Sequence, residues 1–257
     1  MTGRRVVRID GLLESAWRYS GYDAIVCIDV LLSATTIVTA VAQGRRVFPA
    51  ATPTDGLRVK WRLTDAVLVT DALERTDGPV PFAGPAWVTA EKRPRTLVHV
   101  SPLAEMLAAV VPGATVYVAC LRNAKATAEE VARRHRKVAI LAAGEAGELC
   151  VEDRMAAAWL AGRLKRRGFA LEGRLTAREV SRWGRPDVSL VGWSRSAERL
   201  RSRGRGDDVE FVLQHVDDLD VVCAYAHGEL RPALRDAASV SRMAAGFDGP
   251  RPAESGQ

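Results

Sequence analysis

The chain has 257 residues, of which 47% are hydrophobic, and its mean hydropathy is -0.05. A chain of this length can bury a core without a disulfide or metal to hold it together. No stretch approaches the roughly 18 apolar residues that a membrane span requires, and the N-terminus lacks the apolar region of a secretory signal. The four cysteines show no metal or redox spacing. We therefore expect a cytoplasmic protein with buried free thiols and no membrane partner.

The formal net charge of +6 makes nucleic acid a partner to consider. The excess comes mainly from arginine-rich runs at residues 133–137, 163–167 and 195–205. Acidic residues flank two of these runs, and no aromatic residues interleave with them as a base-stacking surface requires. The runs are typical of solvated helix faces, so we expect no nucleic-acid partner.

In chain order, strand patterns alternate with helix patterns. Strands are predicted at residues 6–9, 24–28, 46–49, 66–69, 96–100, 115–119, 138–142 and 221–225. Helices are predicted at residues 12–17, from Thr35 to Gly44, from the N-cap Thr52, and at 102–110, 124–135, about 150–167 and 207–214. Residues 171–206 are helical and rich in arginine.

This alternation predicts an α/β fold with a mostly parallel sheet flanked by helices on both faces. The Gly- and Pro-rich residues 71–95 are predicted to be an irregular surface insertion. We expect a single compact domain over residues 1–230, followed by a mobile C-terminal tail at residues 231–257.

Asp29 is the first candidate for chemistry, because it ends the unbroken apolar strand 24–28. Open α/β sheets bind ligands at the carboxyl ends of their strands. Thr35 and Thr36 follow where the next helix begins, and they are further candidates for a ligand site. The structural alternatives are that Asp29 caps the turn and that the hydroxyls only start the helix. Glu152, Asp153 and Asn123 have a similar alternative, since acids and Asn are favoured at helix starts without any function.

The sequence has no Walker loop, no Rossmann glycine fingerprint and no nucleophile elbow, so none of these motifs indicates its chemistry. The order of five segments, however, resembles the 2-phosphosulfolactate phosphatase family from about residue 5 to residue 230. The segments are IDVLLSATTIVTAVAQG, CLRNAKATA, AAGEAGELCVEDRMAAAWLAG, SAERLRSRGRGDDVEF and LDVVCAY. The resemblance implies a Mg²⁺-dependent phosphohydrolase that acts on a small phosphorylated acid, a step in coenzyme M synthesis. We also expect a homo-oligomer.

Carried over by position, the resemblance implies that Asp29 and one of Glu152 or Asp153 approach Mg²⁺. It also implies that Thr36 and Asn123 orient phosphate, and it retains Gly144 and Gly147, which we expect to bind phosphate together with Thr35. Mg²⁺ prefers hard oxygen ligands such as these carboxylates, and helix N-termini can hold phosphate oxygens.

The chain also departs from the family pattern. The family has an arginine where this chain has Leu32, and its Thr-Thr-Asn-Gly-Thr turn falls at about residues 99–103, where those groups are missing. Arg122 is the candidate to restore the lost cation, with His99 or Asp71 adding polar contacts. The alternative is a catalytically degenerate relative that is retained for binding or assembly.

Overall fold

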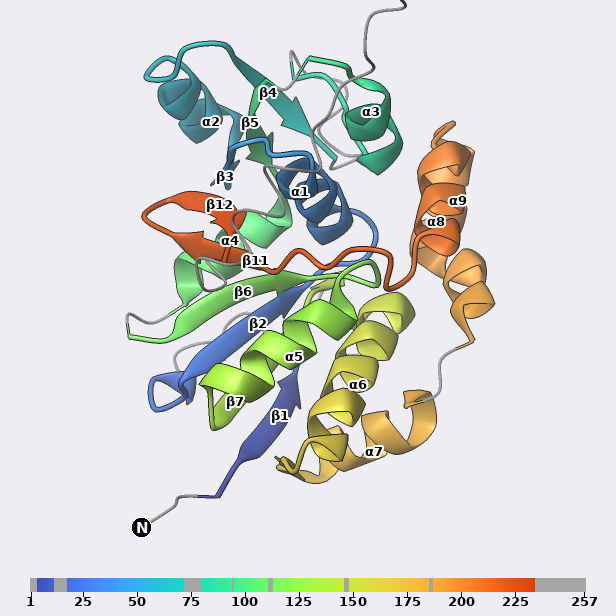
Figure 1. The fold of residues 1–257 in the computed structure, drawn as a ribbon. Helices are drawn as coiled ribbons and strands as arrows, with labels where there is room; N and C mark the ends of the chain where they lie inside the picture. Colours follow the sequence, from blue (N-terminus) through green and yellow to red (C-terminus); the bar gives the residue numbers. More distant parts are fainter. Residues whose placement is uncertain are drawn as a thin grey trace, which may run out of the picture.

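The computed structural model describes residues 4–11, 18–71, 80–93, 95–110, 113–145, 148–184 and 187–233. Within these ranges ten strands form one sheet in the order β10-β1-β7-β2-β6-β11-β12-β3-β5-β4, and a separate β8–β9 hairpin lies outside it. Helices pack along the sheet (Figure 1). The architecture is α/β, as predicted.

The sheet strands are β1 (Val6–Asp10), β2 (Ala24–Ile28), β3 (Val47–Ala50), β4 (Ala66–Thr70), β5 (Thr96–Val100), β6 (Thr115–Ala119), β7 (Lys137–Ala142), β10 (Ala170–Leu171), β11 (Cys223–Ala226) and β12 (Glu229–Pro232). The hairpin strands are β8 (Gly144–Glu145) and β9 (Glu148–Leu149). The helices are α1 (Ser33–Ala42), α2 (Pro53–Lys60), α3 (Pro85–Ala90), α4 (Pro102–Ala109), α5 (Ala124–Arg134), α6 (Val151–Arg166), α7 (Arg174–Trp183), α8 (Arg195–Ser202) and α9 (Gly206–Gln214), with a 3₁₀ turn at Val188–Trp193.

The sheet consists of two parallel blocks joined by an antiparallel hairpin. Strands β10, β1, β7, β2 and β6 are parallel neighbours, and so are β3, β5 and β4. Between the blocks, β11 pairs antiparallel with β6, β12 with β11, and β3 with β12. Three successive antiparallel pairings mean that β3 runs opposite to β6. The mostly parallel sheet is confirmed, but the reversal in its middle was not expected.

Helices cover both faces of the first block, as predicted. Along β2, Ala24, Val26 and Ile28 pack with buried residues of α5 and α6. Ile25 and Cys27 point the other way and pack with α1 and α4. The side chains of β2 thus alternate between two covered faces, and all five residues are buried. This is why the strand appears in the sequence as an unbroken apolar run. The second block packs on α2 through Ala50, Leu68, Val98 and Val100.

Several boundary predictions are confirmed in detail. The Thr52 side chain accepts a hydrogen bond from the Asp55 N–H, as an N-cap does, and Gly44 after α1 has φ +76°. The strand β12 was missed, and it extends the sheet to Pro232, two residues beyond the predicted boundary at Leu230. The predicted helix at 12–17 and the tail from residue 234 lie outside the described residues.

The segment predicted as a surface insertion is partly ordered against the fold. Phe82 forms a bridge with Thr70, and α3 follows at once. Val80, Ala83 and Val88 are buried. The described part of this segment therefore belongs to the packed structure rather than to an excursion over the surface. Residues 72–79 and 94 lie outside the description.

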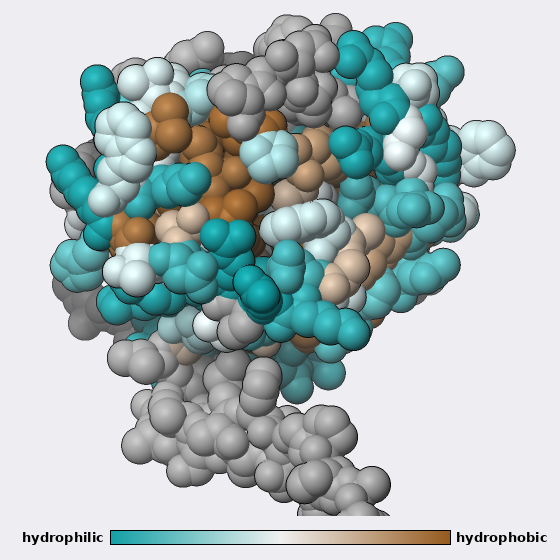
Figure 2. Space-filling view, turned by 90° about the horizontal axis from the view of Figure 1, so that it is seen from above, coloured by the Kyte–Doolittle hydropathy of each residue, from teal (hydrophilic) through white to brown (hydrophobic). Residues whose placement is uncertain are grey.

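Seen from above, the molecule shows apolar residues gathered in the middle of a face that is otherwise mainly hydrophilic (Figure 2). Three large hydrophobic side chains are exposed among the described residues, namely Trp61, Leu190 and Trp193. In the described ranges, no helix combines the length and the apolar character that a membrane crossing requires.

Candidate active site

Four buried acidic side chains come together at the carboxyl end of β2, and we call them the acidic cluster. Asp29 follows β2, Asp71 follows β4, and Glu152 and Asp153 lie in the first turn of α6. Their exposed fractions are 8% or less. The Val30 N–H donates to Asp153 Oδ1 over 2.7 Å, and Ser33 Oγ lies 3.3 Å from Asp71 Oδ1. The structure thus joins three residues predicted as metal ligands and adds Asp71.

The turn after β2 fixes Asp29 and the start of α1. The Ala34 N–H donates to the Asp29 carbonyl over 2.9 Å, and Thr35 Oγ1 donates to the Val30 carbonyl over 2.8 Å. Thr36 Oγ1 donates to the Leu32 carbonyl over 3.2 Å. Both hydroxyls are buried and bond their own turn. Both hydroxyls therefore stabilise this turn, and their contact with phosphate stays a prediction.

The acidic cluster raises the pKa values of its own members. Burial raises the pKa of Asp29 to about 7, and the negative charges of Asp71 and Glu152 add to the rise. Hydrogen bonds from Ser33 favour the charged form and oppose this rise only in part. Burial and the charges of Asp29 and Glu152 raise the pKa of Asp153 in the same way. No Lys or Arg forms an ion pair with these four carboxyls among the described residues.

The raised pKa of Asp29 predicts how the metal-free protein responds to pH. The folded state holds a proton on Asp29 up to about pH 7, whereas an unfolded Asp loses it near pH 4. The contribution of Asp29 to stability is therefore fully present below about pH 4 and is lost as the pH rises through 7. In EDTA, Asp29→Asn should raise the free energy of unfolding at pH 8 by a few kcal/mol, with little change at pH 4. Denaturant titration at both pH values measures this, and an equal effect at both would contradict it.

Two oxygens of the acidic cluster have no hydrogen-bond partner, namely Glu152 Oε2 and Asp71 Oδ2. His99 Nε2 lies 3.1 Å from Asp71 Oδ2, yet neither atom is aligned for a hydrogen bond. A buried carboxylate oxygen without a hydrogen-bond partner lowers the stability of the folded state unless a cation binds it. No three His, Cys, Asp or Glu side chains of the described residues are arranged to hold one metal ion together. Mg²⁺ needs only one or two carboxylates when water and phosphate complete its shell, so the cluster fits it in that form.

Asp208, Arg205 and Phe82 lie beside this cluster and were missed by the sequence analysis. Asp208 Oδ1 accepts a hydrogen bond of 3.0 Å from the Ala86 N–H at the start of α3. Burial raises the pKa of Asp208, and the charge of Asp71 adds to the rise. The Arg205 guanidinium stacks 4.0 Å above the centre of the Phe82 ring, and Phe82 pairs with Thr70 next to Asp71. From the sequence, Asp208 was predicted only to belong to a short helix over residues 207–214.

Gly84 is required where Asp208 approaches α3. A Cβ at this position would lie 2.3 Å from Asp208 Oδ1, closer than such atoms can approach. The absence of a side chain thus lets the carboxyl reach the N-terminus of α3. This contact connects the segment that follows β4 with α9.

Arg122 and Asn123 are already engaged by other protein groups. Arg122 donates to both oxygens of Asp218 over 3.0 and 2.5 Å, and to Thr39 Oγ1 over 2.8 Å. Asn123 Oδ1 accepts from the Cys120 N–H, and its Nδ2 donates to the Val118 and Val221 carbonyls. Asn123 is the N-cap residue of α5, as the structural alternative predicted, but its side chain makes no capping hydrogen bond. Both residues brace the segments that follow β6 and precede β11.

The predicted phosphate-binding glycines lie in the stretch between β7 and α6. Gly144 begins the β8–β9 hairpin and pairs with Leu149. Gly147 lies outside the described residues. The structure therefore places Gly144 between β7 and α6, one residue after Ala143, whose N–H donates to the Ile28 carbonyl at the end of β2.

The family model of 2-phosphosulpholactate phosphatase matches residues 85–228. The chain belongs to this family. The match begins at α3 and ends after β11, so it includes Asn123, Glu152, Asp153 and Asp208. Asp29 and Asp71 precede the matched region and are brought to it by the fold. No curated protein matches the chain.

Proposed function

We propose that the chain is a Mg²⁺-dependent phosphatase that hydrolyses a small acidic phosphomonoester, either 2-phosphosulfolactate or a related phosphorylated acid. Family membership supports the reaction class. The observation that carries the metal dependence is the acidic cluster, whose carboxyls are buried without an Arg or Lys partner among the described residues. A cytoplasmic location and a homo-oligomer remain predictions.

Asp29 and Glu152 are the carboxyls that we assign to Mg²⁺. Glu152 Oε2 is free, whereas Asp153 Oδ1 is used by the Val30 N–H, so Asp153 holds the turn after β2 in place. Bound Mg²⁺ would neutralise charge on the phosphoryl oxygens as the P–O bond breaks. Without metal the pKa of Asp29 is about 7, so binding of Mg²⁺ near neutral pH would displace a proton from this carboxyl.

The substrate is an anion, so a cation is needed beside the acidic cluster. Arg122 was predicted for this purpose, but Asp218 already neutralises it. Arg205 is the better candidate, because its guanidinium lies over Phe82 next to the cluster and makes no side-chain hydrogen bond to any described residue. We assign Arg205 to the acidic group of the substrate, where its planar fork fits an oxyanion.

Replacing Arg205 by alanine should then raise KM for the substrate by about tenfold, the effect of losing one charge-assisted hydrogen bond of roughly 1.5 kcal/mol. The thermal stability should change little, since the side chain is only half-buried. Steady-state kinetics of wild type, Arg205→Ala and Arg205→Lys would measure this. An unchanged KM in the alanine variant would remove Arg205 from the site.

Phosphate release from 2-phosphosulfolactate and a panel of small phosphomonoesters, with Mg²⁺ or with EDTA, tests the proposed function. Turnover that requires Mg²⁺ supports it, and the best substrate identifies the acid. The degenerate alternative is favoured by the loss of the family arginine at Leu32. If folded protein releases no phosphate from any substrate with Mg²⁺ present, the degenerate alternative replaces the proposal.

A further inference from the structure

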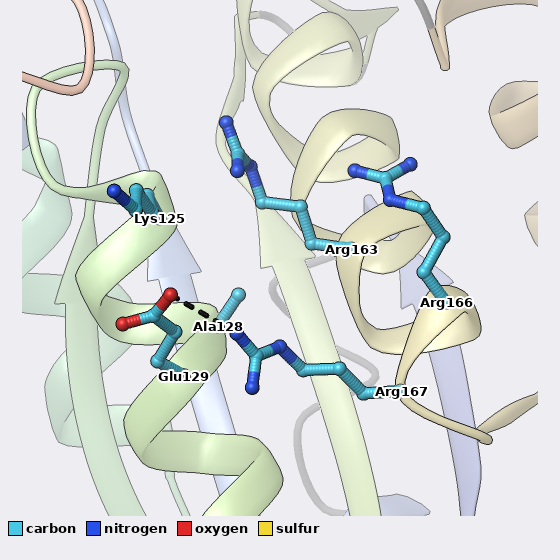
Figure 3. A pocket seen from close by; sticks show the side chains of 6 residues that line it. All are labelled: Lys125, Ala128, Glu129, Arg163, Arg166 and Arg167. Carbon is cyan, nitrogen blue, oxygen red and sulfur yellow. Dashed lines mark hydrogen bonds and ion pairs between the residues drawn. The ribbon is translucent and has the colours of Figure 1, made fainter.

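A basic hollow lies between α5 and α6, on a part of the molecule that the proposed chemistry does not use. Its volume is about 270 Å³, and it is lined by Lys125, Ala128, Glu129, Arg163, Arg166 and Arg167. Figure 3 shows the side chains of α5 on one side, and on the other Arg163 and Arg166 of α6 with Arg167, the residue after the helix.

The charges around the basic hollow are only partly balanced. Arg167 pairs with Glu129 over 3.0 Å, and Arg163 pairs with Asp217. Lys125 and Arg166 make no side-chain hydrogen bond or ion pair with any described residue. Four cations thus face two carboxylates, which leaves two positive charges in a small space.

Arg163 offers a further donor that the fold leaves unused. Its Nε is buried and has no hydrogen-bond partner, although its Nη2 bonds Asp217. The Arg163 guanidinium also lies 4.8 Å from the centre of the Trp159 ring, which limits its movement. A buried N–H without an acceptor is costly, and an oxyanion in the hollow would supply one.

We propose that the basic hollow binds a small phosphate-type oxyanion, such as inorganic phosphate or pyrophosphate. Arginine forks bind phosphate oxygens in pairs, and a lysine ammonium adds a mobile charge. Glu129 and its ion pair with Arg167 close one side, which disfavours a long polyanion running through. The site therefore fits a compact anion of two to four charges better than a nucleic-acid strand.

The basic hollow is separate from the acidic cluster. Arg163 and Asp153 both belong to α6 and lie ten residues apart, which is about 15 Å along a helix. The N-terminus of α5 does not provide the site, because its Lys125 N–H already bonds Asp217 Oδ1 over 2.8 Å. Binding at the basic hollow should therefore be independent of Mg²⁺ and of Asp29.

Calorimetric titration of inorganic phosphate and of pyrophosphate into the metal-free protein, in EDTA at constant ionic strength, tests the proposal. We expect one site per chain, retained in Asp29→Asn. The double variant Lys125→Ala/Arg166→Ala should bind at least tenfold more weakly. A control variant, Arg174→Ala/Arg203→Ala, removes two exposed charges elsewhere and should bind like the wild type.

Three results would overturn the proposal. The first is that neither anion shows saturable binding. The second is that the control variant weakens binding as much as the double variant does. The third is that binding is lost in Asp29→Asn but kept in the double variant.

Titration with a single-stranded RNA at the same ionic strength tests nucleic acid as the alternative ligand. RNA binding with a steep salt dependence, together with no pyrophosphate binding, would assign the basic hollow to nucleic acid instead. None of these results depends on phosphatase activity.

Discussion

Asp29→Asn should reduce Mg²⁺-dependent phosphate release by roughly 10²- to 10⁴-fold, because a bound metal contributes several kcal/mol to stabilising the transition state and Asp29 is one of its two assigned carboxylates. Asn keeps the size and one acceptor oxygen of Asp29, but it carries no charge and is a weaker ligand for Mg²⁺. Because the acidic cluster repels the Asp29 carboxylate, the variant should be at least as stable as the wild type in EDTA. The loss of rate would then not be a loss of folding. Initial rates at saturating Mg²⁺ measure the effect.

Asp55→Asn is the matched control for this substitution. Asp55 is also an aspartate near a helix start, but it is exposed on α2 and pairs with Arg58 over 3.0 Å. The control should keep the wild-type rate within a factor of two, since surface pairs of this kind contribute little. A fully active Asp29→Asn enzyme would show that the acidic cluster is not the site of reaction.

Arg154→Ala should destabilise the protein by about 3 kcal/mol or more at pH 7, because it leaves a buried charge without its main partner. Arg154 of α6 donates to both oxygens of Glu179 of α7, over 3.0 and 2.9 Å. The Glu179 side chain is fully buried, with 0% exposure. Guanidinium chloride titration of both proteins measures the difference.

Two measurements distinguish loss of the Arg154–Glu179 ion pair from loss of side-chain packing. They are the pH dependence of the destabilisation and the effect of replacing Arg178, the second arginine that contacts Glu179. Burial raises the pKa of Glu179, but the hydrogen bonds and charges of Arg154 and Arg178 outweigh it and leave the pKa lowered. The stabilisation is therefore present above the pKa of an unfolded Glu and is lost as the pH falls through the folded value. Arg178→Ala, whose side chain is 69% exposed, should cost less than about 1 kcal/mol. An equal cost for both arginines, or one independent of pH, would contradict the account.

The fold class could be predicted from the sequence because strand and helix periodicities are local. The apolar run at β2 indicated a strand covered on both faces, and α1 and α6 follow where the pattern places them. The acid at the end of β2 and the acids at the start of α6 were predicted as partners. The pairing of Val30 with Asp153 now connects these two segments.

The rest of the site depends on contacts that no local pattern contains. Asp71 follows a strand of the second parallel block, which the β11–β12 hairpin reverses relative to the first. Asp208 reaches the site only because Gly84 leaves room for it. Arg122 had suitable chemistry for phosphate, but its partner Asp218 lies 96 residues away in sequence. Such long-range pairs decide which charges remain free for a ligand.

The most direct test of the account is a calorimetric titration of Mg²⁺ into the metal-free protein at pH 7, in two buffers with different heats of ionisation. We expect one Mg²⁺ per chain and a release of protons, because a cation at the acidic cluster favours the charged form of Asp29, whose pKa is about 7 without metal. Glu152→Gln should weaken the binding at least tenfold. Absence of Mg²⁺ binding to the folded wild-type protein, or unaltered binding in Glu152→Gln, would contradict the assignment of the acidic cluster as the metal site.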